Sequence, residues 1–202
     1  MIEQSIRPFY QKILVDPIAN RLINSTTPIQ ITLASGFLGL ACIPLIYNQY
    51  NLMAIIVLLI SGYLDTLDGT LARLQNSSSS IGSVLDIMMD RLVEFSAIFG
   101  LYLLSPQVRA TTTIILLGSI LWCVTSFLVV GIFSPNEGEK GFHYSPGLIE
   151  RAETFIFIGL MIIWPKAYNG LAITLTLFIF MTTMMRLYQF IKFSKFSKSL
   201  KN

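Results

Sequence analysis

Six apolar stretches recur along the chain, each close to the length of a membrane-spanning helix. Such a helix needs about 20 consecutive, mostly apolar residues. Short polar or proline-containing segments separate the stretches: Pro28 precedes the first, residues 48–51 follow it, and the polar run 76–80 precedes the third. The predicted spans are 29–48, 52–72, 82–104, 111–133, 148–165 and 169–190. The pattern predicts an all-α integral membrane protein with six transmembrane helices.

The first 23 residues follow a different pattern. Arg7, Lys12 and Arg21 alternate with apolar side chains, and no continuous apolar core of a cleavable signal peptide is expected there. This mixture is typical of an amphipathic helix that lies on the membrane surface. The expected organisation is one domain over residues 1–202, with a surface helix at 1–23, a six-helix bundle at 29–190 and a basic tail at 191–202.

Composition supports the membrane assignment. Hydrophobic residues make up 53% of the 202 residues and charged residues only 12%, whereas a soluble domain carries about 25% charged residues. The net charge of +3 gives no reason to expect a nucleic-acid partner. Cys42 and Cys123 both lie in apolar stretches and form no disulfide or zinc pattern.

The lysines and arginines predict the orientation. With the N-terminus inside, the outer loops hold Arg109 and Lys166 alone. Cytoplasmic loops carry the excess of lysine and arginine in membrane proteins. We therefore expect a multi-pass protein of the inner (cytoplasmic) membrane with both termini in the cytoplasm. The positions on the inner side are Arg7, Lys12, Arg21, Arg73, Lys140, Arg151, Lys192, Lys195, Lys198 and Lys201.

Five acidic residues interrupt the second and third stretches, near their expected cytoplasmic ends. They are Asp65, Asp68, Asp86, Asp90 and Glu94. A carboxylate at the centre of a membrane costs about 2.5–3.5 kcal/mol even on insertion scales. A position near the boundary lowers this cost, but such a concentration of acids in apolar helices still indicates a function.

The spacing of the aspartates predicts a metal site. Asp65 and Asp68 are three residues apart and Asp86 and Asp90 are four apart, so each pair shares one helix face. Carboxylates that face one another repel unless cations compensate them, and Mg²⁺ or Mn²⁺ prefer such oxygen ligands. Four carboxylates suffice for two ions, an arrangement suited to displacement at phosphorus. The alternative is pairing with Arg73 and Arg91, but two arginines cannot neutralise five acids. For Glu94 we expect a supporting or packing role, with a pair to Arg91 as the alternative.

Small residues and one arginine accompany the acids. Gly69 inside a helix costs about 1 kcal/mol relative to alanine, which favours the close approach of a ligand or of another helix. Ala72 lies on the side of Asp65 and Asp68, and Gly82 opens the third stretch. Arg73 is placed to bind a phosphate. Close helix packing alone is the alternative explanation for the two glycines.

These residues together match a known signature. Residues 65–90, DTLDGTLARLQNSSSSIGSVLDIMMD, fit D-x(2)-D-G-x(2)-A-R-x(8)-G-x(3)-D-x(3)-D at all eight fixed positions. The chain thus resembles the CDP-alcohol phosphatidyltransferases, and its length and six predicted spans resemble that family too. Members transfer a CDP-linked lipid to a second alcohol and release CMP.

The resemblance implies roles for individual residues. Asp65, Asp68, Asp86 and Asp90 would hold two Mg²⁺ or Mn²⁺ ions, and Asp90 would also be the general base. The donor CDP-diacylglycerol would lie at the membrane boundary of an active site that faces the cytoplasm, and a homodimer is expected. The segment TPIQIT at residues 27–32 is similar to the family's entry to the first span, with Ile29 where asparagine is usual. Donor-binding positions implied by the resemblance are Gly69, Ala72, Arg73, Ser79, Gly82, Ile29, Gln30 and Thr32.

The class of the acceptor alcohol can be judged from the cations that would bind it. A phosphorylated acceptor needs cations near the metal site, and Arg151, Arg186, Lys140 and His143 are the candidates. Ordinary inner-face charge is the alternative explanation for these four. The stretches LDIMMDR and GLIERAE resemble the branch that makes phosphatidylinositol phosphate. A phosphorylated polyol, such as inositol phosphate or glycerol 3-phosphate, is therefore favoured, while serine and other unphosphorylated alcohols stay open.

A different class of function also fits carboxylates within a membrane, namely a transporter or channel for divalent cations. Such a protein needs polar residues along several spans, up to the outer face. The fourth and sixth stretches contain only scattered serine and threonine, and no acid lies in the outer half of a predicted span. The sequence therefore favours the enzyme.

Overall fold

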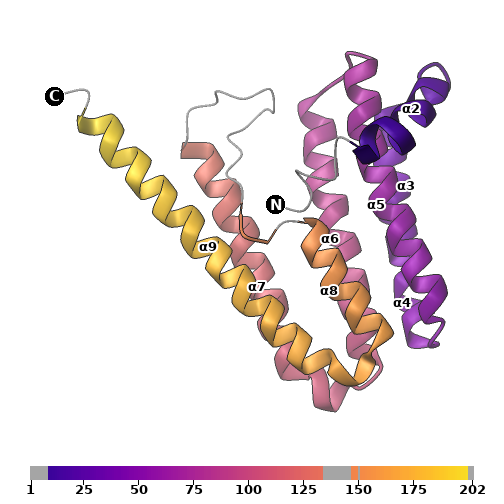
Figure 1. The fold of residues 1–202 in the computed structure, drawn as a ribbon, viewed down its shortest axis with the longest axis vertical. Coiled ribbons are helices and arrows are strands. Elements are labelled where there is room, and N and C mark those ends of the chain that lie inside the picture. Colours follow the sequence, from indigo (N-terminus) through magenta and orange to yellow (C-terminus); the bar gives the residue numbers. More distant parts are fainter. Residues whose placement is uncertain (1–8, 134–146, 150, 200–202) are drawn as a thin grey trace.

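The structure, a computed structural model, describes residues 9–133, 147–149 and 151–199, with side chains up to Lys192. Every regular element in these ranges is helical. Helices run in alternating directions, and α2, the α5–α6 turn and the C-terminal part of α9 lie at the same end of the bundle (Figure 1). The elements are η1 (Gln11–Val15), α2 (Asp16–Leu22), α3 (Pro28–Leu40), α4 (Cys42–Tyr47), α5 (Asn51–Leu74), α6 (Ser80–Leu103), α7 (Pro106–Phe133), α8 (Arg151–Ile163), η2 (Pro165–Ala167) and α9 (Tyr168–Ser199).

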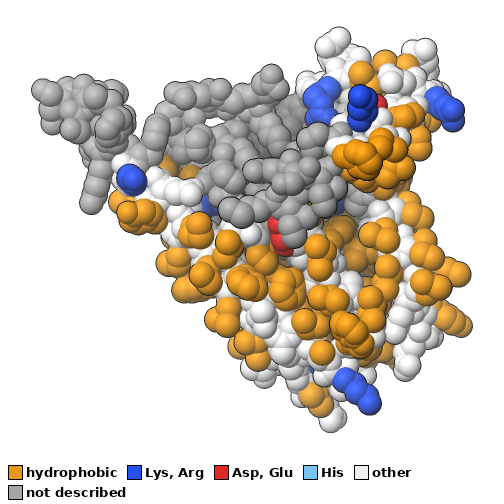
Figure 2. All heavy atoms as spheres, viewed as in Figure 1, with side chains coloured by type: hydrophobic (Ala, Val, Ile, Leu, Met, Phe, Trp, Pro, Cys, Tyr) orange, Lys and Arg blue, Asp and Glu red, His pale blue; other side chains and the backbone are white. Residues whose placement is uncertain are grey.

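The helices confirm a multi-pass membrane protein. The segments Pro28–Tyr47, Asn51–Leu74, Pro106–Phe133 and Pro165–Lys192 are long and apolar enough to cross a membrane. Hydrophobic side chains cover most of the described surface in Figure 2, and lysine and arginine gather towards its two ends. Two predicted spans do not meet that standard: α6 has 24 residues but carries four charged ones, and the described helix α8 has 13 residues.

The first predicted span, 29–48, is interrupted at Ala41. Pro44 lacks the N–H that would bond to the carbonyl of Leu40 in a continuous helix. The backbone N–H of Ala41 instead bonds to the carbonyl of Leu38, 3.0 Å away. The chain therefore continues as the short helix α4. At the other end of the protein, residues 191–199, expected as a tail, extend α9 as helix.

In place of the single helix expected over residues 1–23, the described part of the N-terminal segment forms two short pieces, η1 and α2. Val15 and Ala19 are fully buried against α5, where Leu67 and Leu71 belong to the same apolar cluster. Phe9 and Ile13 point outwards, with 72% and 51% of their surfaces exposed. One face of the segment thus packs on the protein and the other is exposed.

Helix α3 packs against both α5 and α6 and sets the distance between them. Small residues permit the close approach: Gly36 faces Met89 of α6, and a Cβ at Gly39 would lie 2.5 Å from Val93 Cγ2. On the α5 side, the Ser35 hydroxyl donates to the Ser61 carbonyl at 2.9 Å. The two aspartate-bearing helices are therefore held in register through α3.

At the end of the bundle opposite the α5–α6 turn, Arg109 joins two turns between helices. This side chain, expected in an outer loop, is buried, and it donates to the carbonyls of Leu101 and Pro165, the latter at 2.5 Å. Its guanidinium also lies 4.6 Å from the centre of the Tyr168 ring. The α6–α7 and α8–α9 turns are thereby fixed to each other, far along the helices from the aspartates.

Candidate active site

Three of the predicted aspartates meet between α5 and α6. One carboxylate oxygen from each of Asp65, Asp68 and Asp86 lies within 4.8 Å of the other two. Asp65 and Asp68 occupy the C-terminal half of α5, and Asp86 lies in the second turn of α6. The α5–α6 turn brings the two helices together, and Asn76 there has a φ of 50°, a conformation that asparagine adopts more readily than most residues.

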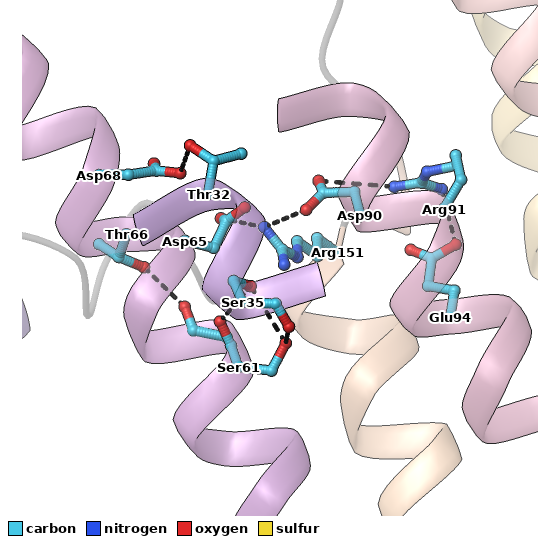
Figure 3. Close-up of polar contacts among 11 residues, drawn as sticks. Thr32, Ser35, Ser61, Asp65, Thr66, Asp68, Asp90, Arg91, Glu94 and Arg151 are labelled. Carbon is cyan, nitrogen blue, oxygen red and sulfur yellow. Dashed lines mark hydrogen bonds and ion pairs between the residues drawn. The ribbon is translucent and has the colours of Figure 1, made fainter. Parts of the chain in front are cut away.

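Asp68 is held by the first residues of α3. The Thr32 hydroxyl donates to the Asp68 carboxylate, and it also lies 3.0 Å from the carbonyl of Pro28 (Figure 3). Thr32 and Asp68 are both buried, with 4% and 5% of their surfaces exposed. The predicted donor-binding residue Thr32 therefore orients a carboxylate of the site.

The fourth aspartate, Asp90, lies beside Arg151 rather than in the group of three. Its Oδ1 is 2.7 Å from Arg151 Nη1, which also forms an ion pair with Asp65. Figure 3 shows Asp65 and Asp90 directed towards this guanidinium from α5 and α6. Arg151 begins α8, so a helix distant in the sequence supplies the nearest described cation to these two aspartates.

Glu94 forms its ion pair with the neighbouring Arg91. The distance from Arg91 Nη1 to Glu94 Oε2 is 2.6 Å, and Glu94 is almost fully buried. Arg91 also lies 3.8 Å from Asp90. Of the two arginines considered as partners for the acids, Arg91 thus pairs chiefly with Glu94, while Arg73 bonds to Thr70.

The residues present fit a divalent cation. Asp68 and Asp86 form no ion pair with a described residue, so Arg151 and the more distant Arg91, among the described residues, compensate only part of the negative charge of the four aspartates. Their donor atoms are all carboxylate oxygens, which are the ligands of Mg²⁺ and Mn²⁺. The close group of three carboxylates is sufficient for one ion, and Asp90 would have to turn from Arg151 to join a second.

The predicted donor-binding residues of α5 and α6 surround this group. Arg73 is exposed and its guanidinium folds back along α5, so that a Cβ at Gly69 would lie 3.7 Å from Nη1. Ala72 is half-buried. Ser79 caps α6: its hydroxyl accepts from the backbone N–H of Gly82 at 3.1 Å. A cap stabilises the first turn of a helix by about 1 kcal/mol, so Ser79 has a structural role here.

The residues that begin α3 have mostly local roles. The Gln30 side chain accepts a hydrogen bond from the Thr27 backbone N–H at 3.1 Å and completes a capping box. Ile29 is half-buried. Of the predicted positions in α3, Thr32 alone contacts an aspartate of the site among the described contacts.

Two of the four predicted acceptor residues, Lys140 and His143, lie outside the described residues. Arg186 of α9 is buried, and its Nη1 lies 3.4 Å from the carbonyl of Cys123. Its Nε is buried without a hydrogen-bond partner. The turn before α8 packs on α9, because the Ile149 N–H donates to the Thr182 hydroxyl at 3.0 Å.

Two residues beside the site, Gln11 and Thr70, were not predicted from the sequence. Gln11 of η1 donates to the Thr70 hydroxyl of α5 at 2.7 Å. Nearby, the ring of Tyr10 stacks edge-on against that of Tyr63, and burial raises the pKa of the Tyr10 phenol above its ordinary value. Thr70 occupies a variable position of the signature, and no pattern in the first 23 residues singles out Gln11.

The chain belongs to the CDP-alcohol phosphatidyltransferase family, whose model matches residues 25–189. It is therefore a transferase of phospholipid biosynthesis. Among curated proteins, it is 30% identical over 169 residues to the inner membrane protein YnjF of Escherichia coli, covering 80% of this chain and 82% of that protein. It is 29% identical over 148 residues to the phosphatidylinositol phosphate synthase of Corynebacterium glutamicum, covering 72% and 67% of the two chains.

Solved structures show the same fold. The phosphatidylinositol phosphate synthase of Mycobacterium tuberculosis with CDP-DAG bound superposes with a TM-score of 0.73 at 22% identity, covering 88% of this chain and 93% of that one. The same enzyme in complex with manganese and citrate also gives 0.73. The bundle described here is thus the fold of a solved phosphatidyltransferase.

Proposed function

We propose that this protein transfers a phosphatidyl group from CDP-diacylglycerol to a phosphorylated polyol, such as inositol phosphate or glycerol 3-phosphate, and releases CMP. The observation that carries the proposal is the cluster of Asp65, Asp68 and Asp86 at the facing ends of α5 and α6. The signature in these helices and the family membership support the donor and the reaction.

The cluster of three carboxylates and Asp90 would hold Mg²⁺ or Mn²⁺, in total two ions. Bound there, the ions would neutralise the donor diphosphate and stabilise the charge that develops on the departing phosphate. Manganese is present in a structure of the similar mycobacterial enzyme, which supports this choice of cation.

The protein's own residues then account for donor binding and proton transfer. Arg73 would contact the nucleotide phosphates beside Gly69, where no side chain obstructs the approach. Asp90 would accept the proton of the acceptor hydroxyl, whose oxygen attacks the lipid-bearing phosphorus. The bond between that phosphorus and the CMP oxygen breaks, and CMP leaves. A correctly placed carboxylate base contributes on the order of 10²–10⁴ in rate.

A phosphorylated acceptor is supported by the position of Arg151. This arginine lies 2.7 Å from Asp90, so a phosphate bound to its guanidinium would bring the attached polyol within reach of the base. Arginine is well suited to bind phosphate through two parallel hydrogen bonds. Arg186, with its unpartnered Nε, is a second candidate. The relatives named phosphatidylinositol phosphate synthase and archaetidylinositol phosphate synthase favour inositol phosphate.

We further propose six membrane crossings, with both termini and the active site at the cytoplasmic side of the inner membrane. The alternating directions of the helices and the charge distribution support this orientation. The exposed apolar face of η1 and α2 would lie against the membrane surface. A homodimer also remains a prediction, which the mass of the protein in lipid nanodiscs would test.

A panel of acceptors tests the proposed function. Purified protein, CDP-diacylglycerol and Mg²⁺ would be combined with inositol phosphate, glycerol 3-phosphate, inositol, glycerol or serine, one at a time. CMP release and the lipid product would be measured. We expect CMP release with a phosphorylated polyol and little with its unphosphorylated form. Turnover with serine or free inositol alone would contradict the proposed acceptor class.

A further inference from the structure

The N-terminal segment contacts the signature of α5 through a chain of hydrogen bonds that ends on Arg73. The Gln11 amide donates to the Thr70 hydroxyl at 2.7 Å, and Arg73 Nη2 donates to the same hydroxyl at 3.0 Å. Thr70 in turn donates to the Thr66 carbonyl at 2.9 Å. The single hydrogen and both lone pairs of this buried hydroxyl are therefore used, which fixes its orientation.

The local structure of η1 fixes the Gln11 amide. This element is a turn of π-helix, in which residues five apart share a face. The second hydrogen of the Gln11 amide accordingly bonds to the Asp16 carboxylate at 3.0 Å. A reversed amide would direct its oxygen at this carboxylate, so the nitrogen faces both Asp16 and Thr70.

Among the described residues, Arg73 has no other hydrogen-bond or ion-pair partner. Its side chain is exposed, and an exposed arginine loses about 2 kcal/mol of side-chain conformational entropy when it is held in one geometry. The bond to Thr70 turns the guanidinium back along α5, with Nη1 beside the open surface of Gly69. A side chain already in its binding geometry loses less freedom when the ligand arrives.

From this geometry we propose that Gln11 and Thr70 are positioning residues, which orient Arg73 to receive the nucleotide phosphates of the donor. The proposal rests on the proposed function, because it needs Arg73 to contact the donor. It assigns to the N-terminal segment a part in substrate binding in addition to its packing on α5.

The test compares variants by their Michaelis constants for CDP-diacylglycerol at saturating Mg²⁺ and acceptor. Thr70→Val removes the hydroxyl and keeps the shape, Thr70→Ser keeps the hydroxyl, and Gln11→Met removes the amide. Tyr63→Phe is the matched control, because the Tyr63 hydroxyl joins the same two elements by donating to the Leu14 carbonyl at 3.0 Å without contacting Arg73. Thermal unfolding of each variant separates losses of stability from losses of binding.

We expect Thr70→Val and Gln11→Met to raise KM by about 2- to 12-fold, the factor that one typical intramolecular hydrogen bond is worth, with kcat changed less than about twofold. The inhibition constant of the soluble product CMP should rise by the same factor. Thr70→Ser and Tyr63→Phe should retain the wild-type KM. Because the effect acts through Arg73, Thr70→Val should add nothing to Arg73→Gln.

Different outcomes would overturn different claims. If Arg73→Gln raises KM but Thr70→Val and Gln11→Met do not, or if all changes are additive, the positioning proposal is wrong and the proposed function stands. If Tyr63→Phe raises KM as much as Thr70→Val, the segment acts through packing alone. If Arg73→Gln leaves KM unchanged while CMP release persists, both the donor contact of Arg73 and its positioning are wrong.

Discussion

Arg151 Nη1 of α8 lies 2.7 Å from Asp90 Oδ1 of α6. The same nitrogen forms an ion pair with Asp65 of α5, so one guanidinium joins three helices at the site. Among the described residues, this charge and the more distant Arg91 nevertheless balance only part of the charge of the four aspartates. The excess of negative charge explains why this end of the bundle should bind divalent cations, and it makes the consequences of substitutions predictable.

Substitution of Asp90 should stop turnover without unfolding the protein. We expect Asp90→Asn to lower kcat by about 10²–10⁴-fold, because asparagine keeps the shape but cannot accept the proton. The measurement is CMP release under saturating substrates, with circular dichroism as the control for folding. Wild-type transfer by this variant would contradict the assignment of the base.

Removal of divalent cations should both inactivate and destabilise the protein. One carboxylate oxygen from each of Asp65, Asp68 and Asp86 lies within 4.8 Å of the other two. These carboxylates repel one another when no cation lies between them. We expect EDTA to abolish activity and lower the midpoint of thermal unfolding, and Mn²⁺ or Mg²⁺ to restore both. The variant Asp86→Asn should show a smaller thermal response to the metal; an unchanged response would exclude Asp86 as a ligand.

Substitution of Arg151 should separate acceptor binding from donor binding. Arg151→Gln should raise KM for the phosphorylated acceptor at least about tenfold, as expected when a phosphate loses a charged partner, with little change for CDP-diacylglycerol. In EDTA the free energy of unfolding of the variant should be lower by about 1–3 kcal/mol. This is less than the roughly 3–5 kcal/mol expected for breaking a fully buried ion pair, because the Arg151–Asp90 pair is partly exposed. The control Arg151→Lys keeps the charge and should restore most of the stability.

Close packing of α3 on α6 should be sensitive to a single methyl group. A Cβ at Gly39 would lie 2.5 Å from Val93 Cγ2, so Gly39→Ala should destabilise the fold by about 1–3 kcal/mol. Gly118 of α7 is the matched control, because a Cβ there meets nothing within 4 Å. Thermal unfolding would compare the two, and Val93→Ala should partly rescue Gly39→Ala. Equal stability of both glycine variants would contradict this packing.

Much of the fold could be predicted because apolar runs and polar turns are local features. The predicted second span, 52–72, corresponds to α5 at Asn51–Leu74, and the third, 82–104, to α6 at Ser80–Leu103. The break at Ala41 was missed, although Pro44 was a visible signal for it. The fifth predicted span, 148–165, corresponds to the shorter described helix α8 at Arg151–Ile163, which has charged residues in its first turn as expected and ends before Pro165.

In the candidate site, too, local features could be predicted from the sequence, whereas contacts between distant residues could not. The aspartate cluster was predictable because its members share helix faces on two consecutive segments. The contacts of Arg151 and Gln11 were not, because they depend on packing between residues that are far apart in the sequence, 59 positions in the case of Gln11 and Thr70. Ser79 and Gln30 stay predicted donor-binding residues, but their roles in helix capping were not foreseen, because capping can be recognised from sequence only once the helix start is known.

The most direct test of the metal site is an anomalous-diffraction experiment on crystals grown with Mn²⁺ and CDP-diacylglycerol. We expect manganese peaks between α5 and α6, within coordination distance of Asp65, Asp68 and Asp86, with the donor diphosphate against them. Manganese found only elsewhere, or a diphosphate bound away from these carboxylates, would contradict the proposed function.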